Sequence, residues 1–370
     1  MSNIEVALVV GTRPQFIKSA PLIKEILSKH RKIDLTISRS GQHYDPRMSE
    51  IFFRELEIPQ PLMNLHAGSG SHAVQTATIM KRLEKPLLKA RPDVVVVSGD
   101  TNTTLAASLT AAKLGIPVAH IEAGLRSGDV TMPEEINRKL TDHCSTLLFA
   151  PTRTAVYNLK KEGLSKATHL TGDTMVDALR IAMRFVKRKQ DVILGQFGLQ
   201  PQDYVLVTLH RPSNVDNLNR LRKIKFALCK IAKRRRVVFP VHPRTHAKLT
   251  KLGPQNSPTN GEITLTNPQG YIEILCLLKN ASCLLTDSGG MVKESFLLHV
   301  PCITLRSNTE WPETLAGKAN RLLFQPETIP RTILETASND RLRESIRSLK
   351  NPFGDGYASS KIANILQETF

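Results

Sequence analysis

The chain has 370 residues, of which 41% are hydrophobic and 23% charged, and its net charge is +18. At about 100–200 residues per domain, this length predicts two domains, and the composition excludes a disordered chain. Apolar runs such as 94–97 are far too short to cross a bilayer, and residues 6–10 run into Gly11 without a signal-peptide pattern. We therefore expect a cytoplasmic protein with no membrane partner, and the charge favours an anionic partner.

Short apolar stretches alternate with stretches of helical periodicity, and the alternation restarts after Leu170. In the first half this predicts strands at 6–10, 34–38, 93–98 and 117–121, and helices at 15–29, 73–89 and 102–114. In the second half it predicts strands at 204–209, 237–241, 263–265, 283–286 and 302–305, and helices at 174–188, 218–232, 272–278 and 291–298. Apolar strands separated by helices are typical of a parallel sheet covered on both faces.

The two halves predict an α/β protein of two Rossmann-like domains with a central cleft. We place the N-terminal domain at residues 1–171 and the C-terminal domain at 172–352. Ligands of such sheets bind beyond the carboxyl ends of the strands, so polar residues at these ends are the candidates for a site.

The five cysteines are widely spaced in apolar surroundings, which predicts buried free thiols in a reducing compartment. They are Cys144, Cys229, Cys276, Cys283 and Cys302.

Acidic residues follow two predicted strands of the first half and open a predicted helix. Asp100 follows strand 93–98, Glu122 follows strand 117–121, and Glu134 and Glu135 stand in a first helical turn. Alone, Asp100 could cap a helix, and the glutamates could complement a helix dipole. Carboxylates at three successive element ends favour general acid–base chemistry instead.

Anion-binding features occur in both halves. Arg13 and Lys18 follow the first strand at a predicted helix N-terminus, and His210 and His242 each follow a strand. The turn at 287–290 offers backbone N–H groups and a hydroxyl to a diphosphate, and a carboxylate four residues later, Glu294, could accept hydrogen bonds from a ribose.

Several common motifs are absent from the sequence. There is no HExxH or paired-cysteine motif, and no GxGxxG, Walker A or GxSxG motif. We therefore expect no metal, and the motifs disfavour a nicotinamide dehydrogenase or a P-loop NTPase.

Many segments, in order along the chain, match one known family. They are GTRPQFIKSAPLI at Gly11, SGQHYD at Ser40, GDTNTTLA at Gly99, HIEAGLRS at His120, MPEEINR at Met132, APT at Ala150, TGDTMVDAL at Thr171, HRPSN at His210, HPRT at His242, TDSGGMVKES at Thr286, NTEWPET at Asn308 and NPFGDGYASSKI at Asn351. Over nearly its full length the chain resembles the UDP-N-acetylglucosamine 2-epimerase family. This implies a fold of the glycosyltransferase-B type, with residues 353–370 packing back on the N-terminal domain.

The resemblance implies interconversion of UDP-N-acetylglucosamine and UDP-N-acetylmannosamine, without a cofactor, by a homodimer. The proton at C2 leaves, UDP is eliminated to give a 2-acetamidoglucal, and both add back with the proton on the other face. The residue types agree with this chemistry, because a weakly acidic C2–H needs a base and an opposing acid, and a departing diphosphate needs cations and N–H donors.

By motif match, the resemblance places the catalytic roles on Asp100, Glu122, Glu134 and His210. It places the UDP-sugar contacts on Arg13, Lys18, Gln42, His43, Arg138, Arg211, His242, Gln269, Ser288, Gly289, Gly290 and Glu294. We expect His210 and Arg13 at the diphosphate.

Three segments depart from the family pattern. Residues 212–214 read Pro-Ser-Asn where many members have Arg-Glu-Asn, and Trp311 stands where many have Arg. Residues 66–76 differ from the form associated with a second, activating UDP-N-acetylglucosamine site.

Four other functions remain open from sequence. A hydrolysing relative would release N-acetylmannosamine and UDP, and another relative would act on a modified UDP sugar such as a diacetamido uronate. A glycosyltransferase of the same fold is disfavoured by the three acids. A nucleic-acid partner is disfavoured because the basic runs are short and the aromatic residues are few.

Overall fold

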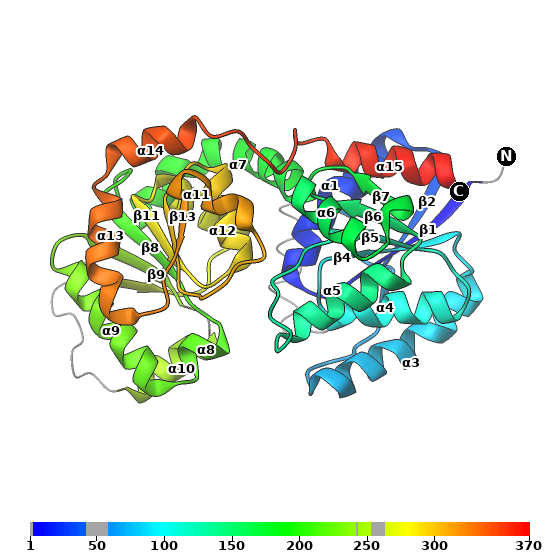
Figure 1. Cartoon of the computed structure of the whole chain (residues 1–370), viewed down its shortest axis with the longest axis horizontal. Helices are drawn as coiled ribbons and strands as arrows, with labels where there is room; N and C mark the ends of the chain where they lie inside the picture. The colour runs from blue at the N-terminus through cyan, green and yellow to red at the C-terminus, as the bar shows by residue number, and fades with distance from the viewer. Residues whose placement is uncertain (1–2, 42–57, 242, 253–262) are drawn as a thin grey trace. The chain divides into compact units, whose positions relative to one another are not determined.

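A computed structural model describes residues 3–41, 58–241, 243–252 and 263–370. The chain forms two compact units, unit 1 with residues 1–182 and 351–370, and unit 2 with residues 183–350 (Figure 1). Helix α7 (Thr174–Gln196) contains the junction between them. Each unit holds one parallel sheet with helices around it, which confirms the predicted α/β class with two Rossmann-like units.

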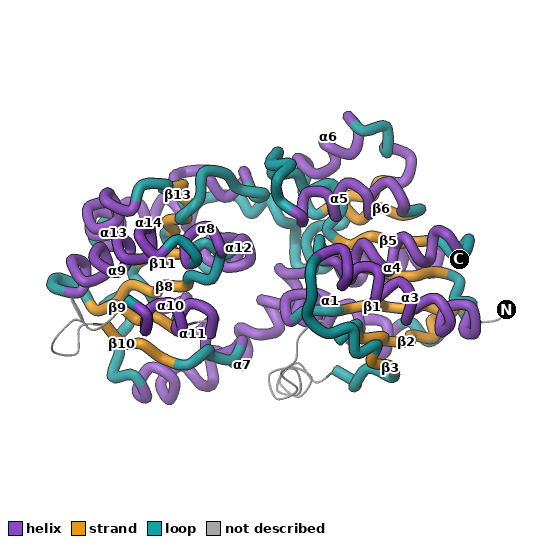
Figure 2. Tube along the Cα trace, turned by 90° about the horizontal axis from the view of Figure 1, so that it is seen from below, coloured by secondary structure: helices purple, strands orange, loops and turns teal. Residues whose placement is uncertain are grey.

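In the described residues, the sheet of unit 1 has seven parallel strands in the order β3-β2-β1-β4-β5-β6-β7 (Figure 2). They are β1 (Ile4–Val10), β2 (Ile33–Arg39), β3 (Met63–Asn64), β4 (Val94–Ser98), β5 (Val118–Ile121), β6 (Leu147–Ala150) and β7 (Thr168–Leu170). The central strand β4 is buried along its whole length, as an unbroken valine run predicts for a strand covered on both faces. The chain order reverses between β1 and β4, and ligands bind at such a switch point in open α/β sheets.

The helices of unit 1 follow its strands. They are α1 (Arg13–Lys29), α3 (His72–Ala90), α4 (Asn102–Lys113), α5 (Pro133–Cys144), α6 (Arg153–Lys161), the short η1 (Ser165–Ala167) and α15 (Ala358–Thr369). Buried Gln15 in α1 accepts from the Gly11 and Thr12 amides at 2.8 and 3.0 Å and donates to the Ser98 carbonyl at 2.7 Å. One amide therefore caps α1 and joins the turn after β1 to the end of β4.

Unit 2 repeats the arrangement, with the described strands in the order β10-β9-β8-β11-β12-β13. They are β8 (Tyr204–Thr208), β9 (Arg236–Pro240), β10 (Ile263–Thr266), β11 (Cys283–Thr286), β12 (Cys302–Thr304) and β13 (Asn320–Leu322). The helices are α8 (Pro212–Val215), α9 (Leu218–Ala232), α10 (Pro243–Lys251), α11 (Tyr271–Asn280), α12 (Gly289–Leu297), η2 (Pro312–Lys318), η3 (Pro326–Thr328), α13 (Ile329–Ala337) and α14 (Asp340–Arg347). Here the order reverses between β8 and β11, so the switch point lies between the turns that carry His210 and Asp287.

The last helix, α15, completes unit 1. It packs against α1 (Figure 1), and His30 Nδ1 lies 3.0 Å from Gln367 Oε1. The buried carboxylate of Asp177 accepts the first two backbone N–H groups of α15, from Ala358 at 3.2 Å and Ser359 at 3.1 Å. A side chain 181 residues away in sequence thus caps this helix.

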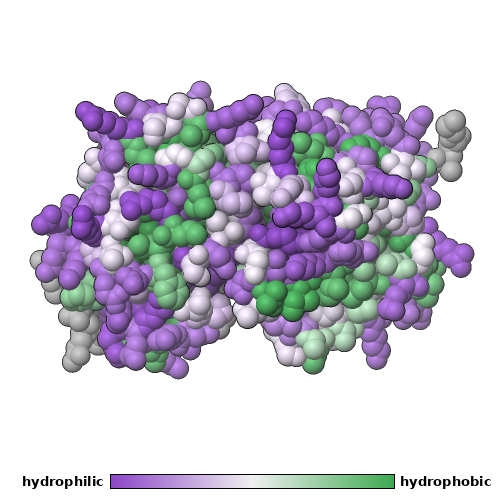
Figure 3. Space-filling model, in the orientation of Figure 1, coloured by the Kyte–Doolittle hydropathy of each residue, from purple (hydrophilic) through white to green (hydrophobic). Residues whose placement is uncertain are grey.

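The surface of unit 1 is partly apolar. Figure 3 shows an apolar band across this unit, and Ile136 and Leu140 on the outer side of α5 are 50% and 45% exposed. Among the described residues, no helix is long and apolar enough to span a bilayer.

All five cysteines are free thiols. Cys276, Cys283 and Cys302 are buried, and burial raises the pKa of the Cys276 thiol to about 11. Cys144 and Cys229 are only half-buried, so the prediction of five buried thiols is wrong for these two.

We expect Asp177→Ala to lower the free energy of unfolding by about 1–3 kcal/mol, because two buried N–H groups of α15 lose their acceptor. Urea unfolding measures this change. Asp191→Ala, which removes an exposed acid of the same helix, is the control and should be nearly neutral. Equal losses in the two variants would contradict the capping role.

Candidate active site

Two candidate carboxylates follow neighbouring strands at the carboxyl edge of the unit 1 sheet. Asp100 lies in the turn after β4, and Glu122 directly follows β5, which pairs with β4. The backbone of Glu122 has φ of +70° and that of Gly99 has φ of +73°. The left-handed region costs a non-glycine residue about 1 kcal/mol or more, and such strain is typical of functional sites.

Lys18 of α1 forms an ion pair with Glu122, whose side chain is 2% exposed. Burial alone would lower the pKa of Lys18, but the carboxylates of Glu122, Asp100 and Asp173 raise it above its usual value. Lys18 therefore stays charged among these acids. Neither Asp173 nor this pairing is predicted from the sequence, in which Lys18 is expected to contact the substrate.

Arg138 of α5 holds the second candidate carboxylate. Its Nε and one terminal nitrogen lie 3.0 and 2.6 Å from Oδ2 of Asp100, and its other terminal nitrogen lies 2.9 Å from Oε2 of Glu135. The neighbouring Asn137 donates to the backbone carbonyl of Asp100 at 2.9 Å. The first turns of α5 thus position the turn after β4 through a side-chain and a backbone contact.

The adjacent acids Glu134 and Glu135 have different environments. Glu135 is buried and accepts from the amide and hydroxyl of Ser127, both at 2.9 Å, and from the Gly128 amide at 3.3 Å. Burial would raise the pKa of Glu135, but the Ser127 and Arg138 hydrogen bonds lower it. Glu134 is half-buried and forms no ion pair with a described residue. The pair therefore divides into a structural acid and an acid available to a ligand.

In unit 2, Asp287 organises the turn that carries His210. This buried carboxylate follows β11 and accepts from the amides of His210 and Arg211, each at 3.1 Å, and from Asn214 Nδ2 at 3.0 Å. The imidazole turns Nδ1 toward Asp287, at 3.3 Å, and its side chain is 44% exposed. The Nε2 edge of His210 thus faces away from Asp287.

The turn at 288–290 opens α12 in the same unit. Ser288 is the N-cap residue, and a Cβ on Gly289 would lie 2.0 Å from Oε1 of Glu310, so a side chain there would displace the Glu310 carboxylate. Glu310 pairs with Arg306 at 2.7 Å and with Arg211 at 3.8 Å. Glu294 is buried, not an exposed helix acid.

Trp311, which departs from the family pattern, lies beside this turn's helix. Its ring is 3% exposed, and Nζ of Lys293 in α12 lies 3.9 Å from the ring centroid. The buried ammonium thus stacks on the indole face, and such a cation–π contact is stronger with tryptophan than with tyrosine or phenylalanine.

The structure describes fewer side-chain contacts, or none, for the remaining residues predicted to bind the UDP sugar. Gln269 precedes α11 and donates to the Asn267 carbonyl at 2.7 Å. Arg13 is the first residue of α1, and its side chain is not described. Gln42, His43 and His242 lie outside the described residues. Among the described residues, no group of three or more His, Cys, Asp or Glu side chains could hold a metal ion.

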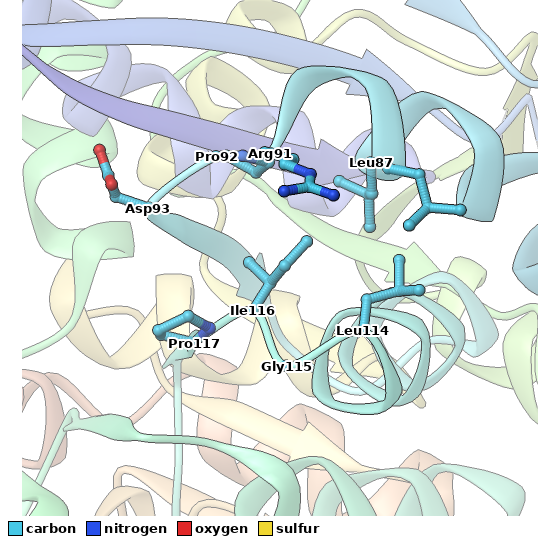
Figure 4. A pocket seen from close by; sticks show the side chains of 9 residues that line it. Leu87, Arg91, Pro92, Asp93, Leu114, Gly115, Ile116 and Pro117 are labelled. Carbon is cyan, nitrogen blue, oxygen red and sulfur yellow. The ribbon is translucent and has the colours of Figure 1, made fainter.

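A pocket of about 530 Å³ lies at the opposite edge of the unit 1 sheet, at the amino ends of β4 and β5 (Figure 4). Leu87, Leu114, Ile116 and Asp93 line it. It contains none of the predicted site residues.

Known proteins resemble the chain in sequence and structure. The family model for UDP-N-acetylglucosamine 2-epimerase matches residues 25–367. A Methanococcus maripaludis protein named UDP-N-acetylglucosamine 2-epimerase homolog is 44% identical over 98% of this chain and 99% of its own. A Pseudomonas aeruginosa protein named UDP-2,3-diacetamido-2,3-dideoxy-D-glucuronate 2-epimerase is 41% identical over 98% of this chain and 99% of its own.

The crystal structure of the Methanocaldococcus jannaschii UDP-GlcNAc 2-epimerase, in complex with UDP-GlcNAc and UDP, matches with a TM-score of 0.90 and 43% identity. The match covers 99% of this chain and 100% of that one. The chain has two α/β units, each with one parallel sheet and polar turns at its strand ends. With the structural match to the M. jannaschii enzyme, these features define an enzyme with a fold of the glycosyltransferase-B type, as predicted. Within that class, the chain belongs to the UDP-N-acetylglucosamine 2-epimerase family.

We expect Glu135→Gln to lower the free energy of unfolding at pH 7 by about 1–3 kcal/mol, because the pair with Arg138 is lost. The folded-state pKa of Glu135 lies below its unfolded value, so its contribution is present above about pH 4.3 and is lost as pH falls through the folded pKa. Urea unfolding should therefore show a smaller difference in the free energy of unfolding between variant and wild type at about pH 3 than at pH 7. Glu84→Gln, at an exposed site of α3, is the control, and a difference independent of pH would contradict this assignment.

Proposed function

We propose that the chain interconverts UDP-N-acetylglucosamine and UDP-N-acetylmannosamine by the non-hydrolysing route. The pairing of two strand-end carboxylates with cations, Glu122 with Lys18 and Asp100 with Arg138, carries this proposal. Family membership and the relatives' names support the substrate. Light scattering on the purified chain tests the homodimer, which is part of the same proposal.

The carboxylates of unit 1 handle the proton at C2. A carboxylate base takes this proton, the C1–O bond to UDP breaks, and 2-acetamidoglucal and UDP form. A second acid then protonates C2 from the opposite face while a diphosphate oxygen of UDP adds to C1. Asp100, Glu122 and Glu134 are the candidates for these transfers, and neighbouring cations favour an ionised base at the start.

The turns of unit 2 bind UDP in this proposal. His210, oriented by Asp287, and Arg211 stabilise the departing diphosphate. Backbone N–H groups at Ser288–Gly290 contribute at the N-terminus of α12, and Glu294 accepts hydrogen bonds from the ribose. The reaction transfers no net electrons, so it needs no redox cofactor.

Incubation of the purified chain with UDP-N-acetylglucosamine in deuterated water, followed by NMR, tests the proposal. We expect UDP-N-acetylmannosamine with deuterium at C2. Free N-acetylmannosamine with UDP would instead establish the hydrolysing reaction. If no product forms and no deuterium is exchanged, both reactions are contradicted.

A second candidate is the same inversion on a diacetamido uronate sugar, which the 41% identity to the P. aeruginosa enzyme favours. Parallel assays with this UDP sugar, compared by kcat/KM, separate the two substrates.

We expect Asp100→Asn, Glu122→Gln and Glu134→Gln each to reduce kcat by about 100-fold or more, because each removes a proton-transfer group. Asp93→Asn is a matched control, because Asp93 precedes the same strand that Asp100 follows and lies at the opposite edge of the sheet. Its kcat should stay within about twofold of the wild type. Retention of kcat in a carboxylate variant would remove that residue from the mechanism.

A further inference from the structure

His120 lies in β5, is fully buried, and has a partner at each ring nitrogen. Its Nδ1 lies 2.7 Å from Oδ1 of Asp142 in α5. Its Nε2 lies 2.8 Å from the backbone carbonyl oxygen of Gly99, in the turn after β4. The ring therefore bridges a helix and a neighbouring strand's end.

Both partners of the ring are acceptors. A backbone carbonyl can only accept, so Nε2 must carry a proton. Burial would raise the pKa of Asp142, but the hydrogen bonds and charges of His120 and Arg126 lower it, so this carboxylate is ionised and also accepts. Nδ1 must then carry a proton as well, and a neutral ring would leave one acceptor facing a lone pair.

The charged groups around the ring balance one another. Asp142 also lies 2.8 Å from a terminal nitrogen of Arg126, which pairs with Glu162 at 2.6 Å. His143 lies 3.3 Å from Glu162 at the exposed end of this chain of contacts. A positive His120 and Arg126 thus face a negative Asp142 and Glu162, which compensates the burial of charge.

The pair of His120 and Asp142 connects the two turns that carry candidate carboxylates. His120 holds the carbonyl of Gly99, which immediately precedes Asp100. Asp142 accepts the Gly124 amide at 3.1 Å, two residues after Glu122. One buried pair therefore restrains the backbone next to both acids.

We propose that His120 carries a proton on both ring nitrogens, and that with Asp142 it acts as a positioning residue that sets Asp100 and Glu122 for proton transfer at C2. The positioning rests on the proposed epimerisation, whereas the charge state of the ring does not. Neither residue is proposed to touch the substrate. Loss of the bridge would misplace the acids and affect proton transfer more than substrate binding.

The protonation state can be read without an activity assay. Nitrogen-15 NMR of the full chain labelled at histidine should show one ring with both nitrogens protonated at about pH 8, where a solvent-exposed histidine is neutral. Asp142→Asn should abolish this signature, because an asparagine amide can donate to Nδ1 and allow a neutral ring. If no ring of the wild type carries both protons at this pH, the proposal is wrong, whatever the variants do.

Kinetics test the positioning role. We expect His120→Phe, which removes both N–H groups but keeps a ring, to lower kcat by about 100-fold with KM changed less than about threefold. Asp142→Asn should lower kcat less than His120→Phe does, because a neutral ring can still donate its Nε2–H to the carbonyl of Gly99. His30→Phe is the matched control, a buried histidine of the same unit that bonds Gln367 far from these turns in the fold, and should keep wild-type kcat.

The outcomes are separable. A His120→Phe variant that keeps kcat within threefold, or that raises KM in proportion, contradicts the positioning role. If His120→Phe does not fold, the kcat and KM of Asp142→Asn decide, and unchanged values contradict it. A doubly protonated ring in a wild-type chain that turns over neither UDP sugar would disprove the proposed function and leave the imidazolium established.

Discussion

A carboxylate buried at the end of a strand is stable only when cations or N–H groups surround it, and both units depend on this constraint. In unit 1, Glu122 has a strained backbone and almost no exposed surface, and Lys18 supplies the compensating charge. In unit 2, Asp287 has no exposed surface and takes its hydrogen bonds from the turn after β8. The same physical requirement thus produces an ion pair in one unit and an N–H cage in the other.

These two solutions suit different tasks. A base that removes a proton from carbon must begin ionised, and an adjacent lysine or arginine keeps a carboxylate in that form. A carboxylate surrounded by backbone amides, such as Asp287, is committed to its own turn and serves by fixing the direction of His210. In the proposed reaction, Asp287 therefore has a supporting role, whereas Asp100 and Glu122 transfer protons.

Local pattern predicted much of the fold and of the candidate site. Strand 93–98 was placed correctly within one residue of β4, because an unbroken valine run leaves little alternative. Strands β7 and β13 were missed because they read Thr-His-Leu and Asn-Arg-Leu, which contain no apolar run. Strand β6 is apolar, but periodicity alone cannot separate so short a run from a buried helix segment. The roles of Asp142 and Asp287 were missed for another reason. Their partners His120 and His210 lie 22 and 77 residues away in sequence, and no local pattern encodes such pairs.

The capping of α15 by Asp177 has a consequence for how the protein is made. Unit 1 is discontinuous, since its closing helix is translated after the whole of unit 2, whereas unit 2 is a single uninterrupted stretch. During synthesis the second unit can fold completely while α1 still lacks its neighbour and the sheet of the first unit is only partly covered. The order of completion is therefore the reverse of the order of translation, an exception to the usual rule that N-terminal domains fold first.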